Sequence, residues 1–155
     1  MRNKIVIIGI NYYPEDSAIG LYSTEKAEYL VSKGFDVTVI TGFPYYPQWE
    51  IREDYKSKNY LVKETINGVK VFRSKQYVPK DPTFIKRIVH LTSFTFGNFL
   101  NLFKVEKPDI VILEGWGLGA KPQTNKQLIK PVNLMEKNQD TTAKWRKYVN
   151  FQLKT

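Results

Sequence analysis

The chain has 155 residues, a length that suits one folded domain with its own hydrophobic core. Hydrophobic residues make up 42% of the chain and charged residues 25%, which excludes an intrinsically disordered protein. The absence of cysteine excludes disulfides and cysteine-ligated metal sites, and the single histidine excludes a histidine metal cluster.

The net charge of +9 is unevenly distributed along the chain. Residues 1–120 contain 16 basic and 13 acidic residues, whereas residues 121–155 contain 8 basic and 2 acidic residues. We therefore expect a folded domain over residues 1–120 and a basic tail over residues 121–155. A basic excess indicates nucleic acid, an anionic membrane surface or a phosphorylated ligand as a partner. Nucleic acid is disfavoured, because residues 1–120 contain no dense Lys/Arg stripe and no known reader motif.

The beginning of the chain predicts a strand, a helix and a second strand. Residues 4–10 form a continuous apolar, β-branched run, which is typical of a strand buried on both faces of a parallel sheet. Residues 11–20 predict a loop and residues 21–33 a helix. Gly34 stands where a helix ends on a left-handed residue. Residues 35–41 predict the second strand.

The segments that follow continue this alternation. Residues 42–49 predict an aromatic and proline-rich loop, and residues 60–73 predict a β-hairpin, because Asn67-Gly68 favours a two-residue turn with positive φ. A long helix is predicted over residues 83–103 and another buried strand over residues 108–113. The predicted fold class is therefore α/β, a Rossmann-like parallel sheet flanked by helices, with a β-hairpin insertion.

The loop between the first strand and the first helix is the first candidate site. In open α/β sheets, ligands bind beyond the carboxyl ends of the strands, and the start of a helix offers free N–H groups to an anion. Gly20 would let the backbone approach such a ligand closely. The Gly-x-Gly-x-x-Gly pattern of dinucleotide sites is absent, since positions 11 and 14 are Asn and Pro. The alternative is a plain strand–helix connection in which Gly20 serves only the turn.

Aromatic, amide and carboxylate side chains gather in two loops that should lie at the same rim of the sheet. The first loop contains Asn11, Tyr12, Tyr13 and Glu15, and the second contains Phe43, Tyr45, Tyr46 and Trp49. Rigid aromatic rings can stack on the C–H faces of a sugar, while amides and carboxylates hydrogen-bond to its hydroxyls. The two loops therefore indicate a saccharide site, with packing of the loops on each other as the equally open alternative.

The helix predicted over residues 83–103 is apolar on nearly all sides, so it is either deeply buried or in contact with lipid or a partner. Lys86 and Arg87 near its start could meet anionic headgroups. Polar interruptions such as Asn98 and Asn101 argue against a membrane span. Core packing is the favoured interpretation, and peripheral membrane contact is the alternative.

His90 and Glu114 are two further polar candidates. His90 lies on the apolar helix, where a histidine is more often a packed residue than a catalyst. Glu114 stands at the carboxyl end of the last predicted strand, a position suited to ligand contact. The alternative for Glu114 is a helix cap or a solvated loop residue.

The sequence resembles a known family over residues 4 to about 113. The segments that carry the resemblance are residues 7–15, 20–22, 28–30 with Gly34, 37–47, 67–71, 77–79 and 107–109. Together they resemble the N-terminal domain of family 4 glycosyltransferases with the GT-B fold, most closely the bacterial exopolysaccharide enzymes of the colanic acid type.

The resemblance implies two Rossmann-like domains that face each other across a cleft. The N-terminal domain would bind a lipid-linked or saccharide acceptor, and the other domain a nucleotide-sugar donor. Transfer would retain the configuration of the sugar and would need no metal or other cofactor. Gly20 matches the glycine that faces the donor phosphates, in a loop with Ser17 and Ile19. The expected acceptor-side residues are Asn11, Tyr12, Tyr13, Glu15, Phe43, Tyr45, Tyr46, Trp49 and Glu114.

A donor domain is not expected within 155 residues, since each domain takes about 100–200 residues. The first hypothesis is therefore a truncated or frameshifted enzyme of cell-surface polysaccharide synthesis that is inactive alone. The alternative is a non-catalytic acceptor- or membrane-binding subunit that works with a separate donor-domain chain. We expect a cytoplasmic location, with the cytoplasmic face of the membrane as the alternative. An unrelated nucleotide binder is disfavoured by the missing glycine pattern.

Overall fold

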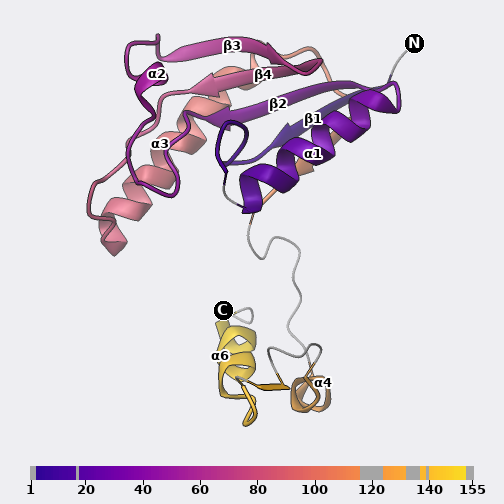
Figure 1. Ribbon diagram of the computed structural model, residues 1–155, viewed down its shortest axis with the longest axis vertical. Coiled ribbons are helices and arrows are strands. Elements are labelled where there is room, and N and C mark those ends of the chain that lie inside the picture. Colours follow the sequence, from indigo (N-terminus) through magenta and orange to yellow (C-terminus); the bar gives the residue numbers. More distant parts are fainter. Residues whose placement is uncertain (1–2, 17, 116–123, 132–136, 139, 153–155) are drawn as a thin grey trace. The chain divides into compact units, whose positions relative to one another are not determined.

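A computed structural model describes residues 3–16, 18–115, 124–131, 137–138 and 140–152 of the chain (Figure 1). The chain divides into two compact units, Met1–Trp116 and Gly117–Thr155. The first unit contains a five-stranded sheet with helices, and the described residues of the second unit include short helices.

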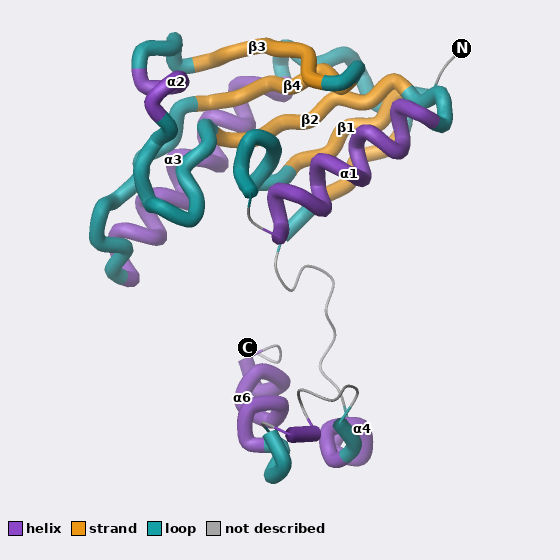
Figure 2. The backbone as a smooth tube through the Cα atoms, in the orientation of Figure 1, coloured by secondary structure: helices purple, strands orange, loops and turns teal. Residues whose placement is uncertain are grey.

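The sheet of the first unit consists of β1 (Lys4–Ile8), β2 (Asp36–Gly42), β3 (Leu61–Ile66), β4 (Val69–Ser74) and β5 (Ile110–Leu113). The order across the sheet is β3-β4-β2-β1-β5, and Figure 2 labels the first four of these strands. All neighbours are parallel except β3 and β4. The chain moves from β1 to β2 and β4 on one side and returns to β5 on the other. This reversal at β1 creates the switch point beside which α/β proteins bind ligands.

The predicted hairpin is confirmed. β3 and β4 pair antiparallel from Leu61 opposite Ser74 to Ile66 opposite Val69. Asn67 and Gly68 connect them with φ angles of 49° and 83°, the positive values that a two-residue turn of this type requires. The hairpin places β3 at one edge of the sheet, and the predicted α/β class with a hairpin insertion is thereby confirmed.

Helix α1 (Ala18–Ser32) packs on one face of the sheet. Alternate strand residues point to that face, because side chains alternate along a strand, and they form the core with Ala27: Ile5, Ile7, Val37, Val39, Val69 and Val71. Gly34, with φ +88°, follows the helix as predicted.

The start of α1 corrects one predicted boundary. Gly20 lies in the first turn of the helix rather than in the preceding loop. The first N–H groups of a helix make no intrahelical hydrogen bond, so sequence patterns mark helix starts poorly. Here the Thr24 hydroxyl donates to the Gly20 carbonyl oxygen at 2.7 Å and joins that turn to the rest of the helix.

Helix α3 (Phe84–Leu102) lies against the other face of the sheet, behind it in Figure 1. The residues it buries are polar or small, namely His90, Gly97, Asn98 and Asn101. Its apolar side chains face outward, and the exposed ones are Phe84, Ile85, Ile88, Val89, Leu91, Phe96, Phe99 and Leu102. The favoured interpretation of core packing is therefore wrong for this apolar face. A helix that is apolar on nearly all sides can bury only the stripe that meets the sheet, and here that stripe is the polar one.

Gly97 lies where α3 approaches the sheet closely, since a Cβ at this position would collide with the Ser74 side chain. We expect Gly97→Ala to lower the free energy of unfolding by about 1–3 kcal/mol, because α3 would have to move away from β4. Chemical denaturation of this variant, of Ser74→Gly and of the double variant checks the prediction. The double variant should recover part of the loss, and purely additive losses would contradict the contact. Thr95→Ala, on the exposed side of α3, is the control.

The described residues of the second unit include α4 (Asn125–Ile129) and α6 (Lys144–Gln152). A capping box opens α4, in which the Thr124 backbone N–H donates to Gln127 Oε1 at 2.9 Å. Asp140 precedes α6 and accepts a hydrogen bond from the Arg146 backbone N–H at 3.0 Å. The basic tail expected from the sequence thus contains local helix-starting signals.

Candidate functional site

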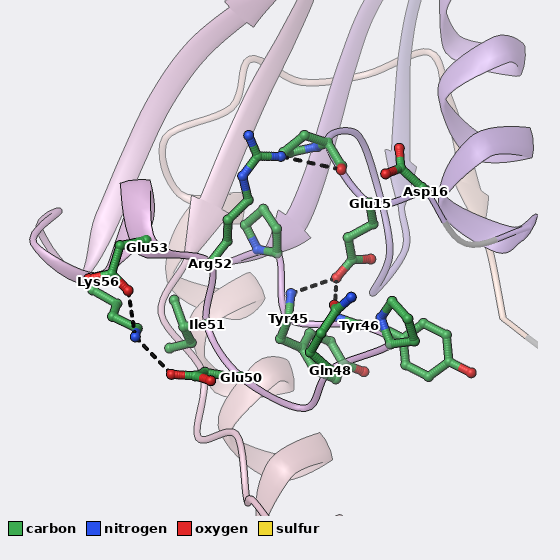
Figure 3. Close-up of a pocket in the computed structure, with 13 residues that line it drawn as sticks. Glu15, Asp16, Tyr45, Tyr46, Gln48, Glu50, Ile51, Arg52, Glu53 and Lys56 are labelled. Atoms are coloured by element: carbon green, nitrogen blue, oxygen red, sulfur yellow. Dashed lines mark hydrogen bonds and ion pairs between the residues drawn. The ribbon is translucent and has the colours of Figure 1, made fainter.

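Two loops at the carboxyl ends of β1 and β2 surround a cavity of about 660 Å³. The first loop connects β1 to α1, and the second connects β2 to the short helix α2 (Glu53–Lys56). Because β1 and β2 are parallel, both loops leave the sheet at the same edge, as the sequence predicts. Figure 3 shows the residues that line the cavity: Pro14, Glu15, Asp16, Pro44, Tyr45, Tyr46, Pro47, Gln48, Glu50, Ile51, Arg52, Glu53 and Lys56. Small-molecule pockets usually measure roughly 300–1,000 Å³, so the cavity has the size of a ligand site.

The buried carboxylate of Glu15 joins the two loops. Its Oε1 accepts hydrogen bonds from the backbone N–H groups of Tyr45 at 2.7 Å and Tyr46 at 2.9 Å. Its Oε2 accepts one from Asn11 Nδ2 at 2.6 Å. The dashed lines from Glu15 in Figure 3 mark the two contacts with the second loop. Both oxygens are thus engaged by the protein, and Glu15 positions the wall of the cavity.

Burial governs the ionisation of Glu15. Desolvation raises the pKa of its carboxyl above the ordinary value of 4.5, while the hydrogen bonds from the Tyr45 and Tyr46 backbone and from Asn11 oppose the rise. The burial effect is the larger, so the folded protein holds this proton more tightly than the unfolded chain does.

Arg73, near the end of β4, lies beneath both loops with its side chain only 1% exposed. Its guanidinium donates to Glu64 Oε1 at 2.5 Å, to the Gly42 carbonyl oxygen at 3.1 Å and to the Tyr13 carbonyl oxygen. A guanidinium offers five N–H donors in a fixed fork, which suits this bridging role. Arg73 therefore connects the first loop, the end of β2 and the edge hairpin.

The side chain of Gln76 fixes the start of the second loop. Its amide exchanges two hydrogen bonds with the Phe43 backbone, each 2.8 Å long. A Cβ at Gly42 would lie 2.7 Å from this amide, so glycine gives Gln76 the room to reach Phe43. Each loop also contains a cis peptide bond, at Tyr13–Pro14 and at Tyr46–Pro47.

The aromatic residues of the second loop divide into buried and exposed positions. Tyr45 is 6% exposed, and its ring centroid lies 4.7 Å from that of His90 and 5.4 Å from that of Trp49. Tyr46 is 41% exposed and is available for stacking at the cavity. Phe43 is fully buried and packs on Tyr55, which places its ring out of reach of a ligand in this structure.

The first loop likewise contains one buried and one exposed tyrosine. Tyr12 is 1% exposed and belongs to the core under α1, and burial raises the pKa of its hydroxyl to about 12. Tyr13 is 51% exposed, and its backbone N–H donates to the Thr24 hydroxyl at 3.0 Å. Neither side chain lines the cavity.

His90 is buried at 2% exposure, the packed position that the sequence favours. Its Nδ1 lies 2.5 Å from the Tyr77 carbonyl oxygen. Because a carbonyl oxygen can only accept a hydrogen bond, Nδ1 carries the ring proton and donates it to Tyr77. Desolvation lowers the pKa of His90, although the Tyr77 carbonyl opposes this. The imidazole is therefore neutral near pH 7 and serves as a platform for Tyr45 and Trp49.

Glu114 stands just after β5, at the switch point. One carboxylate oxygen pairs with Lys26 of α1, and a Cβ at Gly9 would lie 3.3 Å from Glu114 Cβ. Gly9 thus gives Glu114 room between β1 and β5. Glu114 does not line the cavity at the two loops.

The residues expected at the donor phosphates lie at the start of α1. Ile19 is 43% exposed and Gly20 is buried, both in the first turn. Ser17 lies outside the described residues.

The two basic residues that the sequence suggests for membrane contact lie at the start of α3. Arg87 Nε donates to the Pro82 carbonyl oxygen at 2.9 Å, and its guanidinium lies 5.6 Å from the Trp49 ring centroid. Lys86 is half-buried beside it.

A cavity of about 830 Å³ lies at the opposite edge of the sheet, lined by residues that include Asn3, Lys4, Gly68 and Asp109. These residues flank the amino ends of β1, β4 and β5. Ligands of open α/β sheets bind at the carboxyl ends, so the smaller cavity at the two loops is the better candidate.

Sequence reasoning missed several residues that build the site. Arg73 is the last residue of the predicted hairpin and Gln76 follows it, and Glu50, Arg52 and Lys56 follow the aromatic loop. An arginine directly after the apolar residues Val71 and Phe72 is a signal that could have revealed Arg73, because a buried charge needs partners. The other residues carry no local signal, since only the return of β4 beside β2 and the turn into α2 place them at the loops.

Comparison with known proteins supports the resemblance. No family model matches the chain. A curated relative from Escherichia coli (strain K12), WcaI, is named for a glycosyl transferase role in colanic acid biosynthesis, and it is 43% identical over 111 residues. The match covers 70% of this chain but 27% of the relative, so the chain spans less than two thirds of the relative's length. The predicted resemblance is thereby confirmed: over 111 residues the chain is similar to a glycosyl transferase that is named for colanic acid biosynthesis.

Proposed function

We propose that the chain forms the acceptor-binding part of a retaining glycosyltransferase in cell-surface polysaccharide synthesis. The enzyme would transfer a sugar from a nucleotide-sugar donor to a lipid-linked or saccharide acceptor. The observation that carries the proposal is the cavity at the carboxyl ends of β1 and β2, in a chain 43% identical to a glycosyltransferase relative over 111 residues.

The lining of the cavity suits a saccharide. Tyr46 offers an exposed ring, Gln48 an amide, and Asp16 and Glu50 carboxylates, all at the mouth formed by the two loops. Such groups stack on a sugar ring and hydrogen-bond to its hydroxyls. Glu15, Arg73 and Gln76 hold the loops in place from below, which limits the ordering that binding would cost.

The donor would bind opposite this cavity, with Ile19 and Gly20 at the start of α1 facing its phosphates. We expect the 155-residue chain to bind the acceptor alone and to support transfer only when a donor-binding domain is supplied.

A chimera tests the proposal. The 111-residue matching segment of the E. coli relative would be replaced by the corresponding segment of this chain. We expect the chimera to restore colanic acid production in cells that lack the relative, and the same chimera with Tyr46→Ala and Gln48→Ala to restore it poorly. A chimera that accumulates as a folded protein but restores nothing would overturn the proposal.

A second candidate is an acceptor- or membrane-binding subunit of a split enzyme, and the outward apolar face of α3 favours it. Phe84, Ile88, Phe96 and Phe99 are between 49% and 79% exposed, and no acidic residue occurs within α3. Ile88, Leu91, Phe96 and Phe99 line a shallow apolar groove along the helix. No helix among the described residues is long and apolar enough to cross a membrane, so this face would lie on the lipid surface.

Vesicle sedimentation tests the membrane candidate. We expect binding to vesicles that contain anionic lipid, and a loss of at least fivefold in Lys86→Gln/Arg87→Gln and in Phe96→Ser/Phe99→Ser. Leu21→Ser, at an exposed apolar position of α1, is the matched control and should bind like the original chain. Equal lack of binding to neutral and anionic vesicles would reject this candidate.

A further inference from the structure

We propose that the cavity at the two loops selects a sugar that carries no anionic group, and that it disfavours uronic acids and phosphorylated sugars. The inference rests on the proposed saccharide function of this cavity and adds the charge class of its ligand. The observation that supports it is that the cationic side chains lining the cavity already form ion pairs with carboxylates.

Both basic residues of the lining are already engaged by carboxylates. Lys56 Nζ lies 2.8 Å from Glu50 Oε1 and 2.7 Å from Glu53 Oε2. Arg52 Nε lies 3.0 Å from Asp54 Oδ1, and its Nη1 lies 3.5 Å from the Pro14 carbonyl oxygen. Figure 3 shows Lys56 between its two carboxylates and Arg52 turned toward the first loop. An anionic ligand would therefore meet cations whose charge is already shared with a neighbouring carboxylate.

Carboxyl groups outnumber cationic groups among the residues that line the cavity. Four carboxyl groups line the cavity, from Glu15, Asp16, Glu50 and Glu53, against two cations, from Arg52 and Lys56. Asp16 is exposed and makes no ion pair or hydrogen bond within the described part of the chain. Its carboxylate is free to accept from a sugar hydroxyl or ammonium group.

Two charged residues flank the lining and balance each other. Asp54 pairs with Arg52, and the positive charge of Lys80 acts on Glu50. The net acidity of the cavity is thus local, because residues 1–120 as a whole carry more basic than acidic residues. A carboxylate or phosphate placed among these groups meets repulsion from Asp16, while both cations of the lining are already paired with carboxylates.

The consequence is a preference of about tenfold for a neutral or amino sugar over its uronate at low ionic strength, a preference that falls as salt is added. The pyrophosphate of a lipid-linked acceptor would accordingly lie outside this cavity, with its sugar inside.

NMR titration of the full 155-residue chain tests the inference. The probes are the methyl glycosides of glucose and galactose, their C6 uronates and their 2-amino-2-deoxy analogues. The backbone amides of Tyr45, Tyr46, Gln48, Trp49 and Glu50 report on binding. We expect shifts with the neutral and amino glycosides at concentrations at least fivefold lower than with the uronates. Uronates that bind as well or better would overturn the charge selection while leaving a saccharide site standing. Binding of none of the probes would overturn the inference together with the saccharide assignment.

Charge-neutralising variants sharpen the test. Asp16→Asn should improve uronate binding at least threefold and change binding of the neutral glycosides less than twofold. Glu25→Gln, an exposed carboxylate of α1 outside the cavity, makes the same change in net charge and should alter neither. If both variants improve uronate binding equally, the net charge of the chain rather than the cavity selects the ligand, and the inference fails.

Discussion

Replacement of Arg73 by alanine is expected to destabilise the first unit by about 3–5 kcal/mol, which approaches the total stability of many domains. The variant leaves the Gly42 and Tyr13 carbonyl oxygens and the half-buried Glu64 without the guanidinium that they share. Removing one member of a buried ion pair leaves the other unpaired, and this costs more than the pair itself contributes. Thermal and chemical denaturation followed by circular dichroism measure the effect.

Arg73→Lys separates the charge from the geometry of the guanidinium. Lysine keeps the ion pair with Glu64 but cannot reach three acceptors on different segments, so an intermediate loss is expected. The control is Glu106→Ala, which removes the exposed ion pair with Lys4 and should cost far less stability than Arg73→Ala. If Arg73→Ala proves no worse than this control, Arg73 does not hold the loops together.

Replacement of Glu15 by alanine is expected to cost about 2–4 kcal/mol and to abolish saccharide binding, because it leaves the Tyr45 and Tyr46 N–H groups and the Asn11 amide without their acceptor. Glu15→Gln retains an oxygen for the two N–H groups, and Asn11 can reverse its amide to match. This variant should therefore lose about 1 kcal/mol or less near pH 7. Denaturation and the NMR titration of the cavity measure both effects.

The comparison of the original chain with Glu15→Gln also predicts how the stability changes with pH. Because burial raises the pKa of Glu15 above 4.5 in the folded protein, the folded state keeps this proton at a pH where the unfolded chain has lost it. Its contribution to stability is therefore fully present below the unfolded pKa and declines as the pH rises through the raised, folded value. The stability of the original chain should fall relative to that of Glu15→Gln as the pH rises from about 4 to about 7. A constant difference between the two over this range would show that the pKa of Glu15 is not raised.

Together these two residues explain why the cavity walls are ordered. Glu15 ties the first loop to the second, and Arg73 ties both to the edge hairpin. Neither side chain lies free at the mouth, so both act by positioning, while Tyr46, Gln48 and Asp16 face the cavity.

Much of the fold could be predicted from local patterns. The β-branched run at residues 4–10 predicts a strand buried on both faces, Asn67-Gly68 predicts the hairpin, and Gly34 predicts the end of α1. These features depend on neighbours in the chain, so the sequence carries them directly. The position of the two loops at one edge also follows, because parallel strands end on the same side.

The site depended on contacts that no local pattern contains. Arg73 reaches Tyr13 across 60 positions of sequence and Gly42 across 31, and these contacts form only because β4 pairs with β2. The outward apolar face of α3 was likewise decided by packing, since Gly97 and the polar residues beside it meet the sheet more closely than bulky apolar side chains could.

By itself the sequence determined the order and type of the five strands and two long helices of the first unit and the resemblance to family 4 glycosyltransferases, and it predicted the rim at which a ligand would bind. Only the tertiary structure decided which members of the aromatic loops enter the core, which carboxylate fastens the loops and which charges neutralise each other around the cavity. The physical reason is that burial and ion pairing depend on the three-dimensional neighbours of a side chain. Those neighbours come from strands and loops far apart in the chain, and residue spacing does not encode them.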